Sequence, residues 1–337
     1  MRKILQYFLK RPLTWMANQL AASPKREIVF NSLTQLYQQG LQEKGNSVKL
    51  VEVDILKDKF IIFSDQHKGN NSWADDFNIS EPNYIAALQS YNQQGFHFIN
   101  LGDSEELWKF NAAELLPHNE ISLAAEAAFH PDRYTRTFGN HDIIWKDKFA
   151  VAFYLKKYFS STPVVYEGVI LKVHGLKIPL NIFLTHGHQG DLMSDNNVVS
   201  TWLVAHIWMP MQRFLRININ SASKDFSLRS LHNKMMYEWS SKRRNLLLVT
   251  GHTHQPVFAS GRYYHHPGSK IDTGQRRDSL TPGYFNTGCC CFDDGDITGI
   301  EIAGGFIRLV KWYDEENGSK RKVLEEIAFE MLVKDLH

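Results

Sequence analysis

Residues 59–65 read KFIIFSD and residues 96–103 read FHFINLGD, so two short apolar runs each end on a polar turn that contains an aspartate. Between them, residues 81–94 (EPNYIAALQSYNQQ) have the apolar spacing of a helix. Helix-like and strand-like runs go on alternating as far as about residue 188, which predicts an α/β core. Because the carboxyl ends of strands in an open α/β sheet share one edge, we expect the side chains that follow these strands to converge.

Five polar motifs occur in order along the chain, and four of them directly follow an apolar run. They are Asp65-Gln66-His67, Gly102-Asp103 with Glu106 following, Gly139-Asn140-His141-Asp142, Thr185-His186-Gly187-His188 and Gly251-His252-Thr253-His254. Carboxylates and imidazoles both bind first-row divalent ions, and an aspartate can bridge two of them, for which Asp103 is the candidate. Two such ions about 3.5–4 Å apart can hold a bridging hydroxide at neutral pH and clamp a phosphoryl centre. The motifs therefore predict hydrolysis of a phosphoester.

These motifs resemble those of the calcineurin-like metallophosphoesterase superfamily, whose pattern is D-x-H, GD-x-x-D/E, GNHD/E, a single H and GH-x-H. The resemblance covers about residues 48–310 and implies an α/β fold, the four-layer α-β-β-α metallophosphoesterase sandwich. It also implies one metal ion held by Asp65, His67, Asp103 and His254, and a second held by Asp103, Asn140, His186 and His252. Manganese is the first choice for the two divalent ions, with iron or zinc as alternatives, because mixed oxygen and nitrogen donors accept all three.

The resemblance assigns the histidine of GNHD to the reaction and not to the metals. His141 is implied to contact the substrate and to stabilise the transition state or protonate the leaving oxygen, with Asp142 orienting it. An imidazole suits this task because its usual pKa is about 6.5. Glu106, His188 and Asp191 are expected to contact the metal ligands or the substrate.

Outside the core, the sequence predicts three further parts. Residues 1–45 are expected to form a helical N-terminal extension, residues 46–313 the metallophosphoesterase domain, and residues 314–337 a C-terminal segment. A helical cap insertion is expected at about residues 192–245, because its first part is apolar nearly all round a helix and its second part is amphipathic and basic. We interpret the cap either as ordinary packing or as a lid over an apolar substrate group or a membrane-facing surface.

Composition leaves the compartment and the partners broad. A formal net charge of +2 favours neither a nucleic acid nor an acidic partner, and the sequence has no basic stripe interleaved with aromatics. The N-terminal apolar run is too short to export the chain or span a membrane, but the basic residues beside it would suit peripheral contact with a membrane surface. Cys289, Cys290 and Cys291 are interpreted as alternating along a strand, and without paired cysteines a reducing cytoplasm is the expected location.

Three hypotheses stay open for the function. The first is hydrolysis of a phosphomonoester or phosphodiester of undetermined identity, with a phosphorylated small molecule or lipid as partner. The second is hydrolysis of a pyrophosphate in a lipid-linked or nucleotide-sugar substrate, because Gly190-Asp191 and the helical insertion resemble the UDP-diacylglucosamine pyrophosphate hydrolase branch. That branch typically has arginine where this chain has His141, which favours the first hypothesis. The third is a non-catalytic scaffold, which the complete set of metal-binding side chains disfavours.

Overall fold

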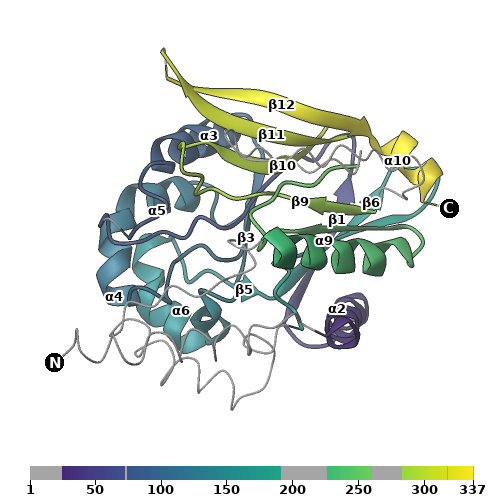
Figure 1. Cartoon of the computed structure of the whole chain (residues 1–337), viewed down its shortest axis with the longest axis horizontal. Helices are drawn as coiled ribbons and strands as arrows, with labels where there is room; N and C mark the ends of the chain where they lie inside the picture. Colours follow the sequence, from purple (N-terminus) through teal and green to yellow (C-terminus); the bar gives the residue numbers. More distant parts are fainter. Residues whose placement is uncertain (1–24, 73, 191–225, 260–282, 317, 337) are drawn as a thin grey trace.

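The computed structural model describes residues 25–72, 74–190, 226–259, 283–316 and 318–336, and two β-sheets form the centre of these ranges (Figure 1). The first sheet has five strands, which are in spatial order β1 (Val48–Asp54), β6 (Gly168–His174), β7 (Leu180–Thr185), β8 (Leu246–Thr250) and β9 (Tyr284–Asn286). The second has seven, which are in spatial order β12 (Gly318–Ala328), β11 (Phe306–Glu315), β10 (Ile297–Ala303), β2 (Phe60–Phe63), β3 (His97–Leu101), β4 (Tyr134–Thr137) and β5 (Val165–Tyr166). The strands that carry the polar motifs at their ends pair in parallel. In one sheet β2 pairs with β3 and β3 with β4, and in the other β7 pairs with β8.

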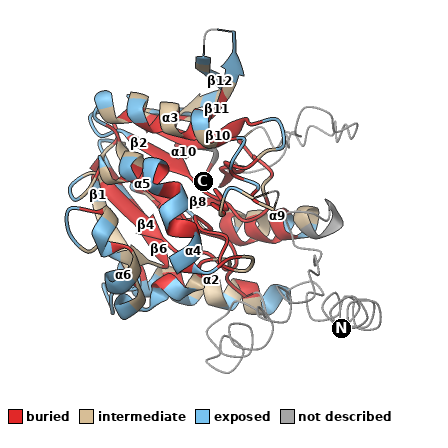
Figure 2. Cartoon of the chain, turned by 90° about the vertical axis from the view of Figure 1, so that its left-hand side faces the viewer, coloured by how far each residue is buried: buried red, intermediate tan, exposed pale blue. Residues whose placement is uncertain are grey.

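Helices cover the outer face of each sheet. The seven-stranded sheet packs against α3 (Glu81–Gln93), α4 (Ala112–Leu115), α5 (Glu120–Ala127) and α6 (Lys148–Tyr154). The short 3-10 helix η1 (Leu116–Asn119) joins α4 to α5, and η2 (Ile143–Lys146) and η3 (Lys156–Tyr158) flank α6. The five-stranded sheet packs against α2 (Arg26–Leu41) and α9 (Phe226–Ser241). Figure 2 shows buried strands between helices whose outer faces are exposed. The last helix, α10 (Phe329–Asp335), contributes Phe329 and Leu332 to the apolar layer between the two sheets.

Strand β2 shows why these residues form a layered structure. All four of its residues are buried, as expected for a parallel strand that is covered on both faces. Because successive side chains of a strand point to opposite faces, Ile61 and Phe63 pack among the helices, whereas Phe60 and Ile62 pack toward the second sheet. A third apolar cluster, which includes Leu33 of α2, lies under the five-stranded sheet. Three apolar layers separate four layers of secondary structure, so the predicted α-β-β-α sandwich is confirmed.

The predicted N-terminal extension, cap and C-terminal boundary can each be compared with the described elements. Of the predicted N-terminal extension, only residues 25–45 are described, and α2 within it packs on the five-stranded sheet through Val29, Leu33 and Leu36. Of the predicted cap, residues 192–225 lie outside the described residues, while α9 packs through Met235, Met236 and Trp239. The expected boundary after residue 313 falls inside β11, and β12 pairs with β11 along its whole length. Residues 314–328 are therefore part of the seven-stranded sheet.

Two further observations concern segments with a predicted role. The three cysteines do not alternate along a strand as interpreted, because β9 ends at Asn286 and residues 287–291 form an irregular connection toward β10. Thr287 and Gly288 begin this connection, and Gly288 has a positive φ of 77°, which takes the chain out of extended geometry. Separately, none of the described helices is long and apolar enough to cross a lipid bilayer.

Candidate metal centre

The five polar motifs follow the carboxyl ends of β2, β3, β4, β7 and β8, and backbone hydrogen bonds tie their turns together. The amide of Asp65 donates to the carbonyl of Gly102 at 3.0 Å, and the amide of His67 donates to the carbonyl of Asp103 at 3.0 Å. In the other sheet, the amide of Gly251 donates to the carbonyl of His186 at 3.0 Å. These turns place carboxylates and imidazoles from both sheets at one edge of the sandwich.

The first group of side chains consists of Asp65, His67 and His254, whose ligand atoms lie within 4.8 Å of one another. Nε2 of His254 is 3.1 Å from Nε2 of His67 and 3.3 Å from Oδ1 of Asp65. The carboxylate of Asp103 lies beside this group, with its Oδ2 3.7 Å from Nε2 of His67. The structure therefore brings together all four side chains that the resemblance assigns to the first ion.

The second group consists of Asp103, His186 and His252, whose ligand atoms also lie within 4.8 Å of one another. Oδ2 of Asp103 is 3.1 Å from Nε2 of His186, so this carboxylate borders both groups. The fourth predicted side chain, Asn140, is buried next to His141, whose backbone amide donates to Oδ1 of Asp103 at 2.7 Å. Asp103 contacts members of both groups, and its Oδ2 lies closer to Nε2 of His186, at 3.1 Å, than Oδ1 of Asp65 does, at 3.9 Å.

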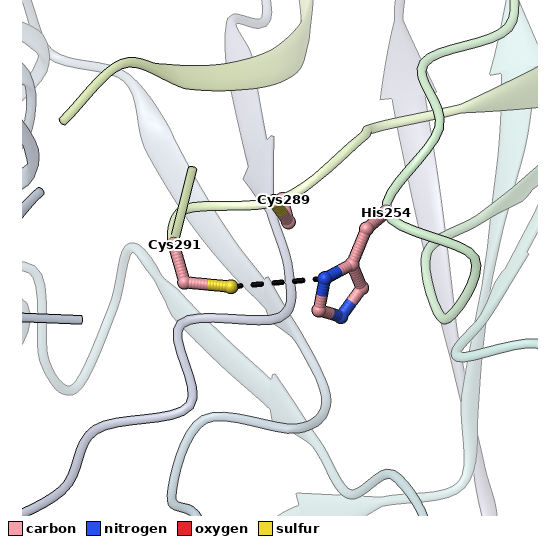
Figure 3. Close-up of side chains that lie close together, drawn as sticks. All are labelled: His254, Cys289 and Cys291. Atoms are coloured by element: carbon pink, nitrogen blue, oxygen red, sulfur yellow. Dashed lines mark hydrogen bonds between the residues drawn. The ribbon is translucent and has the colours of Figure 1, made fainter. Parts of the chain in front are cut away.

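Each of three imidazoles is oriented by a contact at Nδ1. Nδ1 of His186 donates to the carbonyl of Leu101 at 3.0 Å, and Nδ1 of His67 lies 3.2 Å from Oε2 of Glu106. Nδ1 of His254 lies 3.7 Å from Sγ of Cys291, as Figure 3 shows. A neutral imidazole that donates from Nδ1 has its lone pair on Nε2, and a partner at the other nitrogen is the usual feature of a metal-bound histidine.

Two further features of the site suit bound cations. Nε2 of His67 lies 3.1 Å from Nε2 of His254, and each of these rings has another partner at its Nδ1. Within the described residues, Oδ1 of Asn140 and Nε2 of His186 are buried without a hydrogen-bond partner. The residues present therefore fit a pair of bound cations.

The backbone at the site is unusual in the same residues. Of the eight non-glycine residues that have a positive φ in the described ranges, five are predicted metal ligands, namely Asp65, His67, Asp103, His252 and His254. A residue with a side chain adopts this conformation only where the surrounding structure imposes it, and such residues concentrate at functional sites. The strained turns aim the side chains into the space between the sheets' ends.

The electrostatics of the site favour positive charge. Burial of the Asp103 carboxyl would raise its pKa, but the imidazoles of His186 and His141 outweigh burial and hold this pKa well below its usual value. Burial would likewise lower the pKa of His186, but the carboxylates of Asp103 and Asp65 outweigh it and raise this pKa to about 9. Without metal, protons on the imidazoles thus balance the buried carboxylates, in the place where cations are expected.

His141 contacts the centre from the side of β4, and its partner is not the one that the resemblance implies. Nδ1 of His141 lies 2.8 Å from Oε1 of Glu106, and its ring stacks on Trp108 with centroids 3.9 Å apart. Nε2 of His141 is 4.0 Å from Oδ2 of Asp103. Glu106 therefore contacts both His67 and His141, and it occupies the orienting position expected for Asp142.

Asp142 has a different place in the structure. Its carboxylate accepts hydrogen bonds from the amide of Gly139 at 2.6 Å and from the amide of Ser104 at 2.9 Å. It thereby joins the turn after β4 to the turn after β3 and lies 3.8 Å from the guanidinium of Arg136, which is buried with Glu105. The expected orienting contact is thus replaced by a contact that holds two turns together, because the carboxylate points back along the turn.

Several further residues were predicted at the site or lie beside the predicted ligands. His188 is buried, its ring centroid lies 5.4 Å from that of His186, and burial lowers its pKa to about 3. Asp191 lies outside the described residues. Sequence reasoning missed Trp108, Cys291 and His232, whose ring lies 5.1 Å from that of His252. These three carry no motif, although Trp108 follows Glu106 by two residues and is close to it for that reason.

Comparison with known proteins adds a family and several distant structures. A family model described as calcineurin-like phosphoesterase matches residues 58–256. Similar solved structures include Vps29 of Cryptosporidium parvum (13% identity, 81% of this chain and 99% of that chain, TM-score 0.34) and a dimetal phosphatase from Danio rerio (10% identity, 79% and 98%, TM-score 0.39). GAP50, the anchor in the inner membrane complex of Plasmodium, is also similar (9% identity, 80% and 88%, TM-score 0.38). No curated protein sequence matches the chain.

Proposed function

Because the chain belongs to the calcineurin-like phosphoesterase family, we propose that it hydrolyses a phosphomonoester or phosphodiester at the metal centre. The observation that supports this proposal most is the position of Asp103. Its carboxylate contacts His67 of the first group and His186 of the second, as a side chain shared by two cations would. When bound, two divalent cations polarise the phosphoryl group and offset the negative charge of its transition state.

Two adjoining sets of side chains would hold the two ions. Asp65, His67 and His254 would hold the first, Asn140, His186 and His252 would hold the second, and Asp103 would be common to both. Leu101, Glu106 and Cys291 keep three of the imidazoles turned so that Nε2 is the binding atom. Manganese remains the proposed metal, with iron or zinc as alternatives, because the donors are mixed oxygen and nitrogen atoms.

His141 supplies the proton in this proposal. Glu106 accepts a hydrogen bond from Nδ1 of His141, so the proton that can be given away is the one on Nε2. Nε2 is the ring nitrogen nearest Asp103, and the side chain is 13% exposed, so a substrate can reach it. The proton passes from Nε2 to the leaving oxygen, and the Glu106 carboxylate stabilises the imidazolium before the transfer.

The proposed substrate is a phosphorylated small molecule or lipid, and the proposed location is the cytoplasm. The substrate proposal rests on the sequence of the predicted cap, whose apolar part lies outside the described residues. The location proposal rests on the absence of paired cysteines in the sequence. Within the described ranges, the metal centre provides general phosphoester chemistry and does not favour one leaving group.

The experiment that tests the proposal is a hydrolysis assay on the full chain. Freshly chelated protein is loaded with manganese and given p-nitrophenyl phosphate or bis-p-nitrophenyl phosphate. We expect turnover of at least one substrate, its loss on renewed chelation and its return on adding metal. Absence of turnover with manganese, iron and zinc alike would contradict the proposal and favour a non-catalytic role.

A further inference from the structure

The cysteines of the connection between β9 and β10 divide into two kinds. Cys290 packs into the apolar cluster between the seven-stranded sheet and its helices. Cys289 and Cys291, one residue to either side, instead group with the imidazole of His254. The backbone fixes this arrangement, because the amide of Cys290 donates to the carbonyl of Asp65 at 3.2 Å and the amide of Thr298 donates to the carbonyl of Cys289 at 3.0 Å.

The group formed by Cys289, Cys291 and His254 has the composition of a site for a soft cation. One ligand atom from each side chain lies within 4.8 Å of the other two. Figure 3 shows the sulfur of Cys291 directed at Nδ1 of His254, with 3.7 Å between them. Thiolates select soft ions such as Zn²⁺, Cd²⁺ and Cu⁺, whereas the carboxylates and amide oxygen of the neighbouring centre suit harder ions.

His254 stands between this group and the proposed dinuclear centre. Its Nε2 faces His67 and Asp65, at 3.1 and 3.3 Å, and its Nδ1 faces the thiols. A neutral imidazole has a single nitrogen lone pair, because the other nitrogen carries the proton. If Nδ1 binds a cation, the proton moves to Nε2, and His254 can no longer be a ligand of the first ion. The two sites therefore compete for one side chain.

We propose that Cys289, Cys291 and Nδ1 of His254 form a separate binding site for one thiophilic cation of the zinc and cadmium class. Binding releases the two thiol protons to solvent, and the two thiolates offset the charge of the ion. The side chain of His254 is 18% exposed, whereas Cys289 and Cys291 are buried. Occupation of the site takes His254 away from the first ion and weakens manganese binding, and if the proposed function holds, it inhibits hydrolysis.

The binding claim is tested with cadmium on the full, metal-free chain. Cadmium bound to thiolate absorbs in the ultraviolet, and cadmium bound only to oxygen and nitrogen does not. We expect a saturable thiolate band in the unmodified chain and in the control Cys290→Ala, which lacks only the sulfur in the apolar core. Cys289→Ser and Cys291→Ser should each lower the affinity for the thiolate-bound ion by about tenfold or more. A missing band in the unmodified chain, or an unchanged band in both serine variants, would overturn the proposal.

Two further measurements keep the test decisive. Cadmium NMR of the unmodified chain needs no variant, and its chemical shift distinguishes a site with sulfur donors from one with oxygen and nitrogen alone. Repeating the absorbance titration with manganese present should lower the apparent affinity for cadmium at the thiolate site by about tenfold. An affinity that manganese leaves unchanged would overturn the shared role of His254. Both readouts are independent of turnover, so an inactive chain would contradict the proposed function without touching this site.

Discussion

The His141 side chain is fixed by two neighbours that the sequence does not mark as partners. Glu106 lies at Nδ1 and Trp108 stacks on the ring, while Asp142, the adjacent carboxylate, bonds to backbone amides. The composition of the site could be predicted from the sequence because every motif carries its ligand types at a strand end. The pairing of side chains could not, because it depends on turn geometry that only the folded backbone sets.

The assignment of His141 as a proton donor predicts a selective loss. His141→Ala should keep its metal content and lose about 10²–10⁴-fold in turnover of an alkyl phosphoester, because general acid help is removed. The loss should be smaller for p-nitrophenyl phosphate, whose leaving group needs little protonation. Rates and metal content are compared with those of His174→Ala, in which an exposed histidine is replaced. Equal losses for both substrates, or lost metal, would count against the role.

The raised pKa of His186 predicts that metal binding depends on pH. Carboxylates of Asp103 and Asp65 outweigh burial and raise this pKa to about 9, and that of His254 is also raised to about 9. Protonated imidazole cannot bind metal, so affinity should rise with pH up to about pH 9, by about tenfold per pH unit for each proton displaced. Calorimetry in buffers of different ionisation enthalpy measures the protons released. No proton release below pH 9 would contradict these pKa shifts.

At the level of elements, the turns after the strands are shaped by close packing. Gly251 follows β8, and a Cβ added there would overlap Oγ of Ser64 and a carboxylate oxygen of Asp65. A Cβ added at Gly283, just before β9, would meet its neighbours only at ordinary contact distance, the nearest atom being 3.4 Å away. Gly251 is therefore required because Asp65, a predicted ligand from the turn after β2, lies where a Cβ would be. The sequence motif contains this glycine, but only the structure gives the reason for it.

This difference predicts opposite outcomes for two alanine substitutions. Gly251→Ala should displace the Asp65 carboxylate and lower metal affinity by about tenfold or more while the sheets stay folded. Gly283→Ala should leave metal binding unchanged, because its methyl group has room. Metal titration and circular dichroism of both variants make the comparison. If Gly251→Ala binds metal with unchanged affinity, the turn can accommodate the methyl group without displacing the Asp65 carboxylate, and the prediction is wrong.

The strands themselves differ in how far the sequence determines them. β2 and β3 are predictable from the sequence, because β2 is a continuous apolar run and β3 is mainly apolar, as burial on both faces of a sheet requires. The three cysteines resemble such a run, yet they form a bend, because Cys290 packs into the core while its two neighbours turn toward His254. Composition alone cannot separate a short apolar strand from a buried connection.

At the level of the whole molecule, the C-terminal residues belong to the sandwich. The sequence predicts a domain boundary after residue 313 and a C-terminal segment over residues 314–337. In the structure, β12 pairs with β11, and α10 contributes Phe329 and Leu332 to the apolar layer between the sheets. The prediction missed this because β12 has few buried side chains and reads as a polar, charged segment. The strand is joined to its neighbours by backbone ladder bonds and by the ion pairs Arg308–Glu326 and Arg321–Glu301, and neither leaves an apolar pattern in the sequence.

A chain that ends at residue 313 should therefore not fold. It loses Phe329, Leu332, Val333 and Leu336, which are all buried. Each such side chain stabilises the fold by about 1.5–3 kcal/mol, so their sum of about 6–12 kcal/mol approaches the whole stability of a typical domain. Met331→Ser, which changes an exposed residue of α10, should fold normally. Soluble yield and circular dichroism measure folding of both variants. If the truncated chain folds, residues 314–337 are not a required part of the domain, and the prediction is wrong.

The central claim is that Asp103 joins two metal ions into one catalytic centre. The most direct test counts metal by elemental analysis of manganese-loaded protein and measures turnover on the same samples. The unmodified chain should hold about two manganese ions and be active. Asp103→Asn should hold fewer and show no turnover, because one carboxylate contacts both ligand groups. If Asp103→Asn keeps two ions and full turnover, the claim is contradicted.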